Sequence, residues 1–137
     1  MPLKNQLTGM RGVYLVAAEL SKHGLIASPT SRSARGADIL ATDVACRRAF
    51  SIQVKANAAT FSYWLLNENA KGMVSDTHIY VFVNMKEGTP PEFYVVPSAI
   101  VAEKTYVEKR TNSTFYSFSR DDARPFQDKW DILREIK

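Results

Sequence analysis

Hydrophobic positions follow two patterns along the chain, one with helical spacing and one with strand character. Apolar residues recur at helical spacing over 8–23, where Thr8 can cap the start of a helix and Gly24 can end it. Short apolar runs bounded by turn residues follow, and each predicts a strand. These runs are LIASPT (25–30), ADILAT (37–42), AFSIQVKA (49–56), THIYVFVNM (77–85) and FYVVP (93–97). The short connection between the second and third runs predicts an antiparallel hairpin.

The remaining segments show weaker patterns. Residues 57–76 have no clear period, so we expect a loop that holds one helical turn or a short strand around 63–66. Three elements are expected near the end: a helix capped by Ser98 over 99–109, a short strand or extended segment over 114–119, and a helix over 123–137 that packs through Phe126, Trp130, Leu133 and Ile136. This order predicts an α/β (α+β) fold with a central mixed sheet, in a single domain over 1–137.

Composition excludes several classes of protein. Hydrophobic residues make up 45% of the chain and charged residues 23%, which is typical of a folded globular protein rather than a disordered one. The single cysteine, Cys46, excludes an internal disulfide framework and a cysteine-rich zinc site. The sequence shows no signal peptide and no apolar run long enough to cross a bilayer. We therefore expect a soluble, cytoplasmic protein without a membrane partner.

The net charge of +4 favours a polyanionic partner such as DNA, because neutralising phosphates releases their counterions. One polar and basic group lies in the loop before Asp38 and is a candidate for contacts with backbone phosphates: Ser31, Arg32, Ser33 and Arg35. A second basic group is interpreted as the solvated face of the helix over 99–109: Lys104, Lys109 and Arg110.

Two of the predicted strands carry polar residues that a buried strand face would not hold. Alternation along SIQVK places Gln53 and Lys55 together on one face of their strand, opposite its apolar residues. Asp38 lies on the partner strand of the hairpin, where antiparallel pairing can bring its carboxylate near Gln53. Glu19 lies near one edge of the apolar side of the first helix, and the backbone carbonyl of Val54 can contribute a further oxygen.

These groups suit metal-assisted phosphodiester hydrolysis. Carboxylate, amide and carbonyl oxygens are hard ligands that select Mg²⁺ or Mn²⁺. A lysine beside the metal can orient or deprotonate the attacking water, or offset charge that develops on the phosphorus centre. The pattern therefore suits metal-dependent phosphodiester hydrolysis, in which Asp38, Gln53, Glu19 and Val54 can offer oxygen atoms to the metal and Lys55 stands beside it.

Glu19, RGADIL (35–40) and IQVK (52–55) together resemble the active-site pattern of the PD-(D/E)XK nuclease superfamily, in particular its Holliday-junction-resolvase-like and restriction-endonuclease-like branch. The resemblance implies a restriction-endonuclease-like α-β-β-β-α-β core, a central mixed sheet flanked by helices. It also implies an Mg²⁺-dependent deoxyribonuclease, possible selectivity for junctions or other DNA structures, and a homodimer. In this comparison Asp38 and Gln53 bind the metal, Lys55 is the catalytic lysine, and Glu19 acts through a water on the metal.

Two positions depart from the family pattern. Gln53 stands where an acidic residue is usual, which lowers the negative charge of the site, and Ala37 stands in the place of the proline. Two alternatives therefore stay open. One is a catalytically degenerate module on the same fold that binds nucleic acid or another partner, and the other is an α+β domain unrelated to nucleic acid. Tyr63 and Trp64 are candidates for stacking on bases or for core packing.

Overall fold

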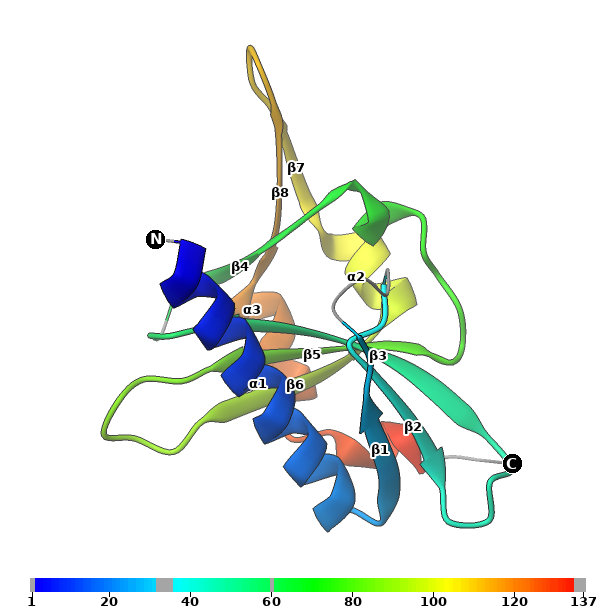
Figure 1. The fold of residues 1–137 in the computed structure, drawn as a ribbon. Helices are drawn as coiled ribbons and strands as arrows, with labels where there is room; N and C mark the ends of the chain where they lie inside the picture. Colours follow the sequence, from blue (N-terminus) through cyan, green and yellow to red (C-terminus); the bar gives the residue numbers. More distant parts are fainter. Residues whose placement is uncertain (1, 32–35, 60, 135–137) are drawn as a thin grey trace.

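The computed structural model describes residues 2–31, 36–59 and 61–134, and within them the chain folds around a five-stranded sheet (Figure 1). That sheet has the order β1-β2-β3-β5-β6, with bounds β1 (Leu25–Pro29), β2 (Ile39–Asp43), β3 (Ala49–Asn57), β5 (His78–Asn84) and β6 (Glu92–Pro97). A second, three-stranded sheet has the order β4-β8-β7 and is formed by β4 (Tyr63–Leu66), β8 (Thr114–Ser119) and β7 (Tyr106–Lys109). The helical elements are α1 (Pro2–Lys22), η1 (Glu68–Lys71), α2 (Ser98–Lys104), α3 (Arg120–Ala123), η2 (Arg124–Phe126) and η3 (Trp130–Leu133). None of the described helices is both long and apolar enough to cross a bilayer.

The larger sheet is mixed, as predicted. β2 runs antiparallel to both β1 and β3, whereas β5 runs parallel to β3 and antiparallel to β6. Ile39 lies opposite Ile52, so the predicted hairpin is confirmed and the apolar residues of β2 and β3 share one face. Parallel strands need a crossover connection. Here β4 and the 3₁₀ turn η1 make it, so the strand around 63–66 and the helical turn are both present.

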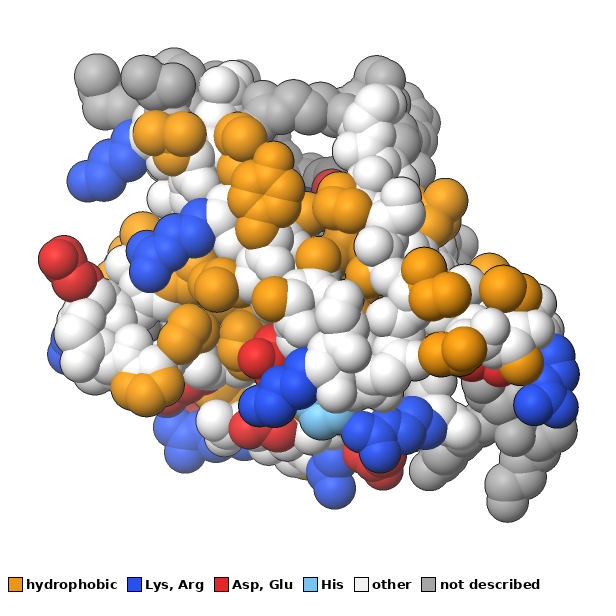
Figure 2. Space-filling model, turned by 60° about the horizontal axis from the view of Figure 1, so that its bottom comes forward, with side chains coloured by type: hydrophobic (Ala, Val, Ile, Leu, Met, Phe, Trp, Pro, Cys, Tyr) orange, Lys and Arg blue, Asp and Glu red, His pale blue; other side chains and the backbone are white. Residues whose placement is uncertain are grey.

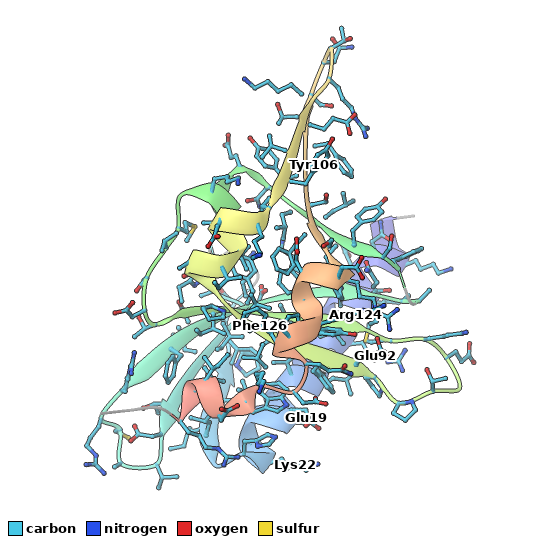
Figure 3. The ribbon with its side chains drawn as sticks, turned by 180° about the vertical axis from the view of Figure 1, so that it is seen from behind. Glu19, Lys22, Glu92, Tyr106, Arg124 and Phe126 are labelled. Atoms are coloured by element: carbon cyan, nitrogen blue, oxygen red, sulfur yellow. The ribbon has the colours of Figure 1, made fainter. Side chains whose placement is uncertain are left out.

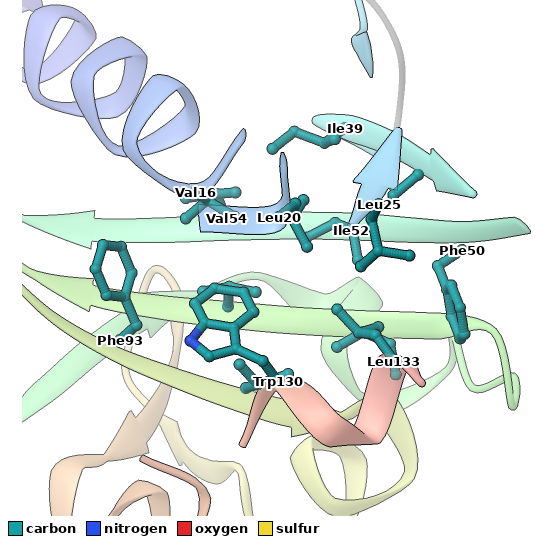
Figure 4. Packing of buried hydrophobic residues seen from close by; sticks show 14 of the residues in the cluster. Val16, Leu20, Leu25, Ile39, Phe50, Ile52, Val54, Phe93, Trp130 and Leu133 are labelled. Carbon is teal, nitrogen blue, oxygen red and sulfur yellow. The ribbon is translucent and has the colours of Figure 1, made fainter. Parts of the chain in front are cut away.

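Alternation along the strands divides the core into two layers. The first layer lies between the sheet and α1, where Val16 and Leu20 of the helix pack on Ile52 and Val54 of β3 (Figure 4). The C-terminal element η3 covers the same face of the sheet farther along, through Trp130 and other buried residues. α1 keeps its apolar side on the sheet because its apolar positions recur at helical spacing.

The opposite face of the sheet is covered by the second sheet and by α2. Trp64 of β4 packs among aromatic side chains of the large sheet, with ring centroids 5.0 Å from Phe82 and 5.5 Å from Tyr94. Its indole N–H donates to the Val83 carbonyl at 3.0 Å. Trp64 is therefore a core residue. Beyond this layer β7 and β8 continue as a hairpin that projects from the body of the molecule (Figure 1).

Two of the three predicted helices form with different bounds in the structure. α1 begins at Pro2 rather than near Thr8. α2 ends at Lys104, because Thr105 adopts an extended backbone and the chain then enters β7. Lys109 and Arg110 are exposed as expected, but they lie on the β7–β8 hairpin and not on a helix.

The long C-terminal helix predicted over 123–137 is wrong. The chain instead forms the short elements α3, η2 and η3, and Asp128 has a positive φ of 54° that interrupts any continuous helix. Asp128 donates its backbone N–H to the Phe93 carbonyl at 2.9 Å, which ties this turn to β6. Trp130 and Leu133 are buried as predicted, whereas Ile136 lies outside the described residues.

Candidate active site

Asp38 lies in a bend directly before β2. Its backbone N–H donates to the Ile52 carbonyl on β3 at 2.8 Å, while its own carbonyl accepts the N–H of Thr30, just beyond β1, at 2.9 Å. In a regular antiparallel strand the two backbone groups of one residue bond to the same neighbouring strand. The chain therefore turns at Asp38. The Thr30 hydroxyl supports this turn by donating to the Ala37 carbonyl at 2.6 Å.

The turn brings the Asp38 carboxylate to the backbone of β3. Its Oδ2 accepts the N–H of Val54 at 2.8 Å, so the side chain occupies a position where β2 would otherwise supply a carbonyl. This bond uses one carboxylate oxygen and leaves Oδ1 without a hydrogen bond to the described residues. The N–H and C=O of a strand residue point to the same side of the strand. The Val54 carbonyl therefore faces the same edge of β3 as its N–H, where the Asp38 side chain lies in place of a β2 backbone group.

A cavity of about 360 Å³ lies beside Asp38, and we call it the Asp38 cavity. It is lined by the N-terminal half of α1, by the end of β1 and by Val54, and the α1 residues are Gln6, Gly9, Met10, Val13 and Tyr14. α1 approaches β3 closely here, because Gly12 has no side chain. A Cβ on Gly12 would lie 2.6 Å from the Cβ of Ala56 and 3.5 Å from Cγ1 of Val54.

Lys55 follows Val54 on β3, and its side chain is half-buried. Desolvation by burial lowers the pKa of its ammonium group from the usual value, and the negative charge of Asp38 opposes this shift. Asp38 and Lys55 therefore act on each other electrostatically. Lys55 lines a second cavity, between the first turns of α1 and the connection from β3 to β4.

Gln53 lies between Asp38 and Lys55 in sequence, but within the described part of the chain no hydrogen bond joins its side chain to either residue. It is half-buried, and it shares a face of β3 with Lys55, as the alternation predicted. In the parallel pairing with β5 it stands beside Tyr80. Asp38 bonds to the backbone of Val54 rather than to the Gln53 amide.

Glu19 is not brought to Asp38. It is half-buried near Lys22, toward the C-terminal end of α1 (Figure 3), and it does not line the Asp38 cavity. Val13 lines that cavity instead, and six residues of α-helix separate it from Glu19 by about 9 Å along the axis. The described residues contain no group of three or more His, Cys, Asp or Glu side chains that could hold a metal.

Of the predicted phosphate contacts, only Ser31 lies within the described residues. It lines the Asp38 cavity, so it is on the expected side of the site. Arg32, Ser33 and Arg35 lie outside the described residues. On the face shown in Figure 2, basic and acidic side chains are interspersed rather than gathered into a patch of one sign.

The first turns of α1 contribute to the site in a way that the residue pattern did not predict. Because the helix starts at Pro2, it places Gln6 beside Asp38 and Lys4 beside Lys55. The signal for this extension was available, since Pro is favoured in the first turn of a helix. The residues Lys4 to Leu7 have no strong apolar period, which made the helix appear to begin later.

No protein-family model matches the chain, and no curated protein matches it. Among solved structures, the chain is similar to Hjc, a Holliday junction resolvase from the archaeal hyperthermophile Archaeoglobus fulgidus, with a TM-score of 0.51 and 16% sequence identity. The match covers 85% of this chain and 93% of the resolvase. The likeness confirms the predicted restriction-endonuclease-like fold, a mixed sheet with flanking helices, and at this identity it shows the fold alone.

Proposed function

We propose that this protein is a metal-dependent nuclease that hydrolyses phosphodiester bonds in DNA. The observation that carries the proposal is the bond from the Val54 N–H to the Asp38 carboxylate, with the Lys55 ammonium close enough to interact with Asp38. The Asp38 carboxylate and the Val54 backbone thus meet at the Asp38 cavity, and Lys55, the next residue on β3, interacts electrostatically with Asp38, in a fold shared with a Holliday junction resolvase.

The donor set fits a hard divalent cation. Asp38 has an oxygen left after its bond to the backbone, the Val54 carbonyl faces the same side, and the Gln53 amide can add a third oxygen. Mg²⁺ or Mn²⁺ held by these residues would supply Lewis-acid stabilisation of the charge on the phosphate. Glu19 has no part in this proposal, because the cavity beside Asp38 is lined by Val13 and not by Glu19.

Lys55 is proposed to act on the scissile phosphate or on the attacking water. Its lowered pKa makes the loss of a proton easier than for an exposed lysine, which suits a residue that exchanges a proton with water. In its charged form it offsets the negative charge that develops on the phosphate oxygens. Ser31, at the edge of the Asp38 cavity, is proposed to contact a neighbouring phosphate.

The test is cleavage of a labelled panel of plasmid, linear duplex, single strand and four-way junction with Mg²⁺ or Mn²⁺. Asp38→Asn keeps an oxygen for the Val54 N–H but removes the charge, and Lys55→Ala removes the amine. Each is expected to reduce cleavage by about 100-fold or more, the usual effect of losing a catalytic acid–base or charge-stabilising group.

Two matched controls share the chemistry of these residues but lie elsewhere. Asp43, at the other end of β2, also accepts backbone N–H groups, from Arg47 at 2.8 Å and Arg48 at 3.1 Å. Lys86 is an exposed lysine after β5. Asp43→Asn and Lys86→Ala are expected to cleave like the wild type. Full activity in Asp38→Asn or Lys55→Ala would show that this site does not cleave DNA.

A second candidate function is DNA binding without cleavage. It is favoured by the low negative charge of the site. Asp38 is the one carboxylate among the described residues that line the Asp38 cavity, Val13 rather than Glu19 lines it, and Gln53 on β3 is neutral. This candidate predicts salt-sensitive DNA binding with no product at any metal concentration. Binding by the wild type with no cleavage of any substrate in the panel would favour it over the nuclease.

A homodimer is proposed together with the nuclease, because two subunits are needed to cut two strands with one site each. Light scattering of the protein alone and with a four-way junction would measure the assembly. A monomer in both conditions would contradict this part of the proposal and leave the chemistry of the single site unaffected.

A further inference from the structure

The second cavity, beside Lys55, has a volume of about 310 Å³, and apart from Lys55 its lining has no part in the chemistry proposed above. We call it the Lys55 cavity. It lies where the first turns of α1, the end of β3 and the connection to β4 meet. The residues that matter for its chemistry are Lys4, Asn5, Lys55, Asn57, Phe61 and Leu65.

The charged groups of this cavity are of one sign. Lys4 and Lys55 line it, and its described lining includes no aspartate or glutamate. The first turn of α1 also lacks an acidic residue. A cavity with two ammonium groups and no carboxylate favours an anionic group.

Part of the lining of this cavity is apolar and exposed. Phe61 is 53% exposed and Leu65 is 58% exposed, which is unusual for large apolar side chains that line one cavity. An exposed aromatic ring offers a flat surface on which a nucleic-acid base can stack.

The backbone that carries Phe61 is tied to the core. Asn84 is buried, and its side-chain amide donates to the Phe61 carbonyl at 3.4 Å. The Asn57 amide donates to the Tyr63 carbonyl at 3.0 Å and to Oδ1 of Asn84 at 3.3 Å. Two asparagines thus hold the backbone carbonyls of Phe61 and Tyr63, so the chain that leads from Phe61 into β4 is tied to β3 and β5.

We propose that the Lys55 cavity holds an unpaired nucleotide of the DNA substrate, with its base against Phe61 and its phosphate between Lys4 and Lys55. This inference rests on the proposed function and adds a substrate class to it. A base inside a duplex is stacked and paired, so its face cannot reach an aromatic side chain. The substrate class is therefore DNA with unpaired nucleotides, as in a single strand or at a branch point. Lys55 lines this cavity and interacts electrostatically with Asp38.

The test is equilibrium binding in EDTA, where no metal-dependent cleavage occurs. The probes are a short fluorescein-labelled single strand and the duplex of the same sequence. The wild type is expected to bind the single strand more tightly. Phe61→Ala should weaken that binding roughly five- to hundred-fold, the effect of losing one base–aromatic stack, and leave duplex binding unchanged. Phe61→Trp should restore it.

Tyr106 provides the matched control, because it is a 59% exposed aromatic residue on β7 that does not line the cavity. Tyr106→Ala is expected to bind like the wild type. Lys4→Gln should weaken single-strand binding and reduce the slope of log K against log salt by about 0.7, the contribution of one phosphate contact.

The outcomes separate this inference from the nuclease proposal. Equal binding of duplex and single strand, an unchanged affinity in Phe61→Ala, or an equal loss in Tyr106→Ala would overturn the inference without affecting the cleavage test. A change of oligomeric state in Phe61→Ala with unchanged DNA binding would identify the surface as a contact between subunits and would also overturn it. Selective single-strand binding that depends on Phe61 would support it even if no cleavage is found.

Discussion

The close approach of α1 to β3 at Gly12 can be tested by adding a single methyl group. The Cβ of an alanine there would lie 2.6 Å from the Cβ of Ala56, whereas carbon atoms in contact are about 3.5–4.0 Å apart. The clash is with a short side chain that has no rotamer to change, so the helix itself must move away from the sheet. Gly12→Ala is therefore an overpacking substitution at the helix–sheet contact beside Val54.

The magnitude follows from two opposing effects. Overpacking in a well-packed core costs about 1–3 kcal/mol. Replacing glycine by alanine inside a helix contributes about 1 kcal/mol of stability. Gly12→Ala should therefore change the free energy of unfolding by between about zero and 2 kcal/mol in the destabilising direction.

Gly9 is the matched control, because it lies in the same helix one turn earlier and a Cβ there would meet no atom within 4 Å. Gly9→Ala keeps the helix-propensity effect without the clash, so it should stabilise the protein by about 1 kcal/mol. The difference between the two variants isolates the overpacking cost, which we expect to be about 1–3 kcal/mol.

Urea denaturation of both variants measures this difference from the midpoints, provided the m-values are equal. A Gly12→Ala variant as stable as Gly9→Ala would refute the reasoning, because it would mean that α1 does not approach β3 at this distance. The shape of the Asp38 cavity depends on that approach.

Three further predictions concern buried polar groups. Asp38→Ala leaves the Val54 N–H without its acceptor and should lower the free energy of unfolding by about 1–3 kcal/mol, with Asp38→Asn less affected, in urea denaturation. Trp64→Phe removes the N–H that the Val83 carbonyl accepts and should cost about 1–3 kcal/mol in the same assay, and an unchanged midpoint would contradict that role. Desolvation lowers the pKa of His78 from 6.5, so as the pH falls below 6.5 the unfolded chain takes up a proton that the folded protein excludes. Stability should therefore decrease with falling pH by about 1.4 kcal/mol per unit down to the folded pKa, and His78→Phe should lack this component; parallel stability–pH curves for the two proteins would refute it.

Much of the fold was accessible from the pattern of residues. Five apolar runs predicted the strands of the large sheet, and the short turn before AFSIQVKA predicted its hairpin. These features depend on neighbours in sequence, namely side-chain alternation and turn length. The helical spacing of Trp130 and Leu133 predicts one C-terminal helix, whereas the break at Asp128 accompanies a hydrogen bond to β6 that the sequence does not display.

In the candidate site, too, some features follow from the local sequence and others from tertiary contacts. Alternation along β3 was enough to place Gln53 and Lys55 on one face, because the direction of a strand side chain depends only on its position in the strand. The turn at Asp38, which directs its carboxylate to the Val54 N–H, requires Thr30, just beyond β1, and Ile52 of β3 to bond to the same residue from opposite sides. Only the tertiary structure could decide this.

The position of α1 over the sheet was also decided by tertiary packing. Helical spacing identified the apolar side of α1, but it left open which turn of the helix would lie beside Asp38. That choice depends on where Gly12 allows the helix to meet β3, and it brings Val13 rather than Glu19 to the cavity. The sequence by itself determined which side chains of β3 share a face and which sides of the elements are buried. Contacts between elements distant in sequence decided which polar residues of α1 and of the chain before β2 lie beside β3. Those contacts fix the position of α1 along β3.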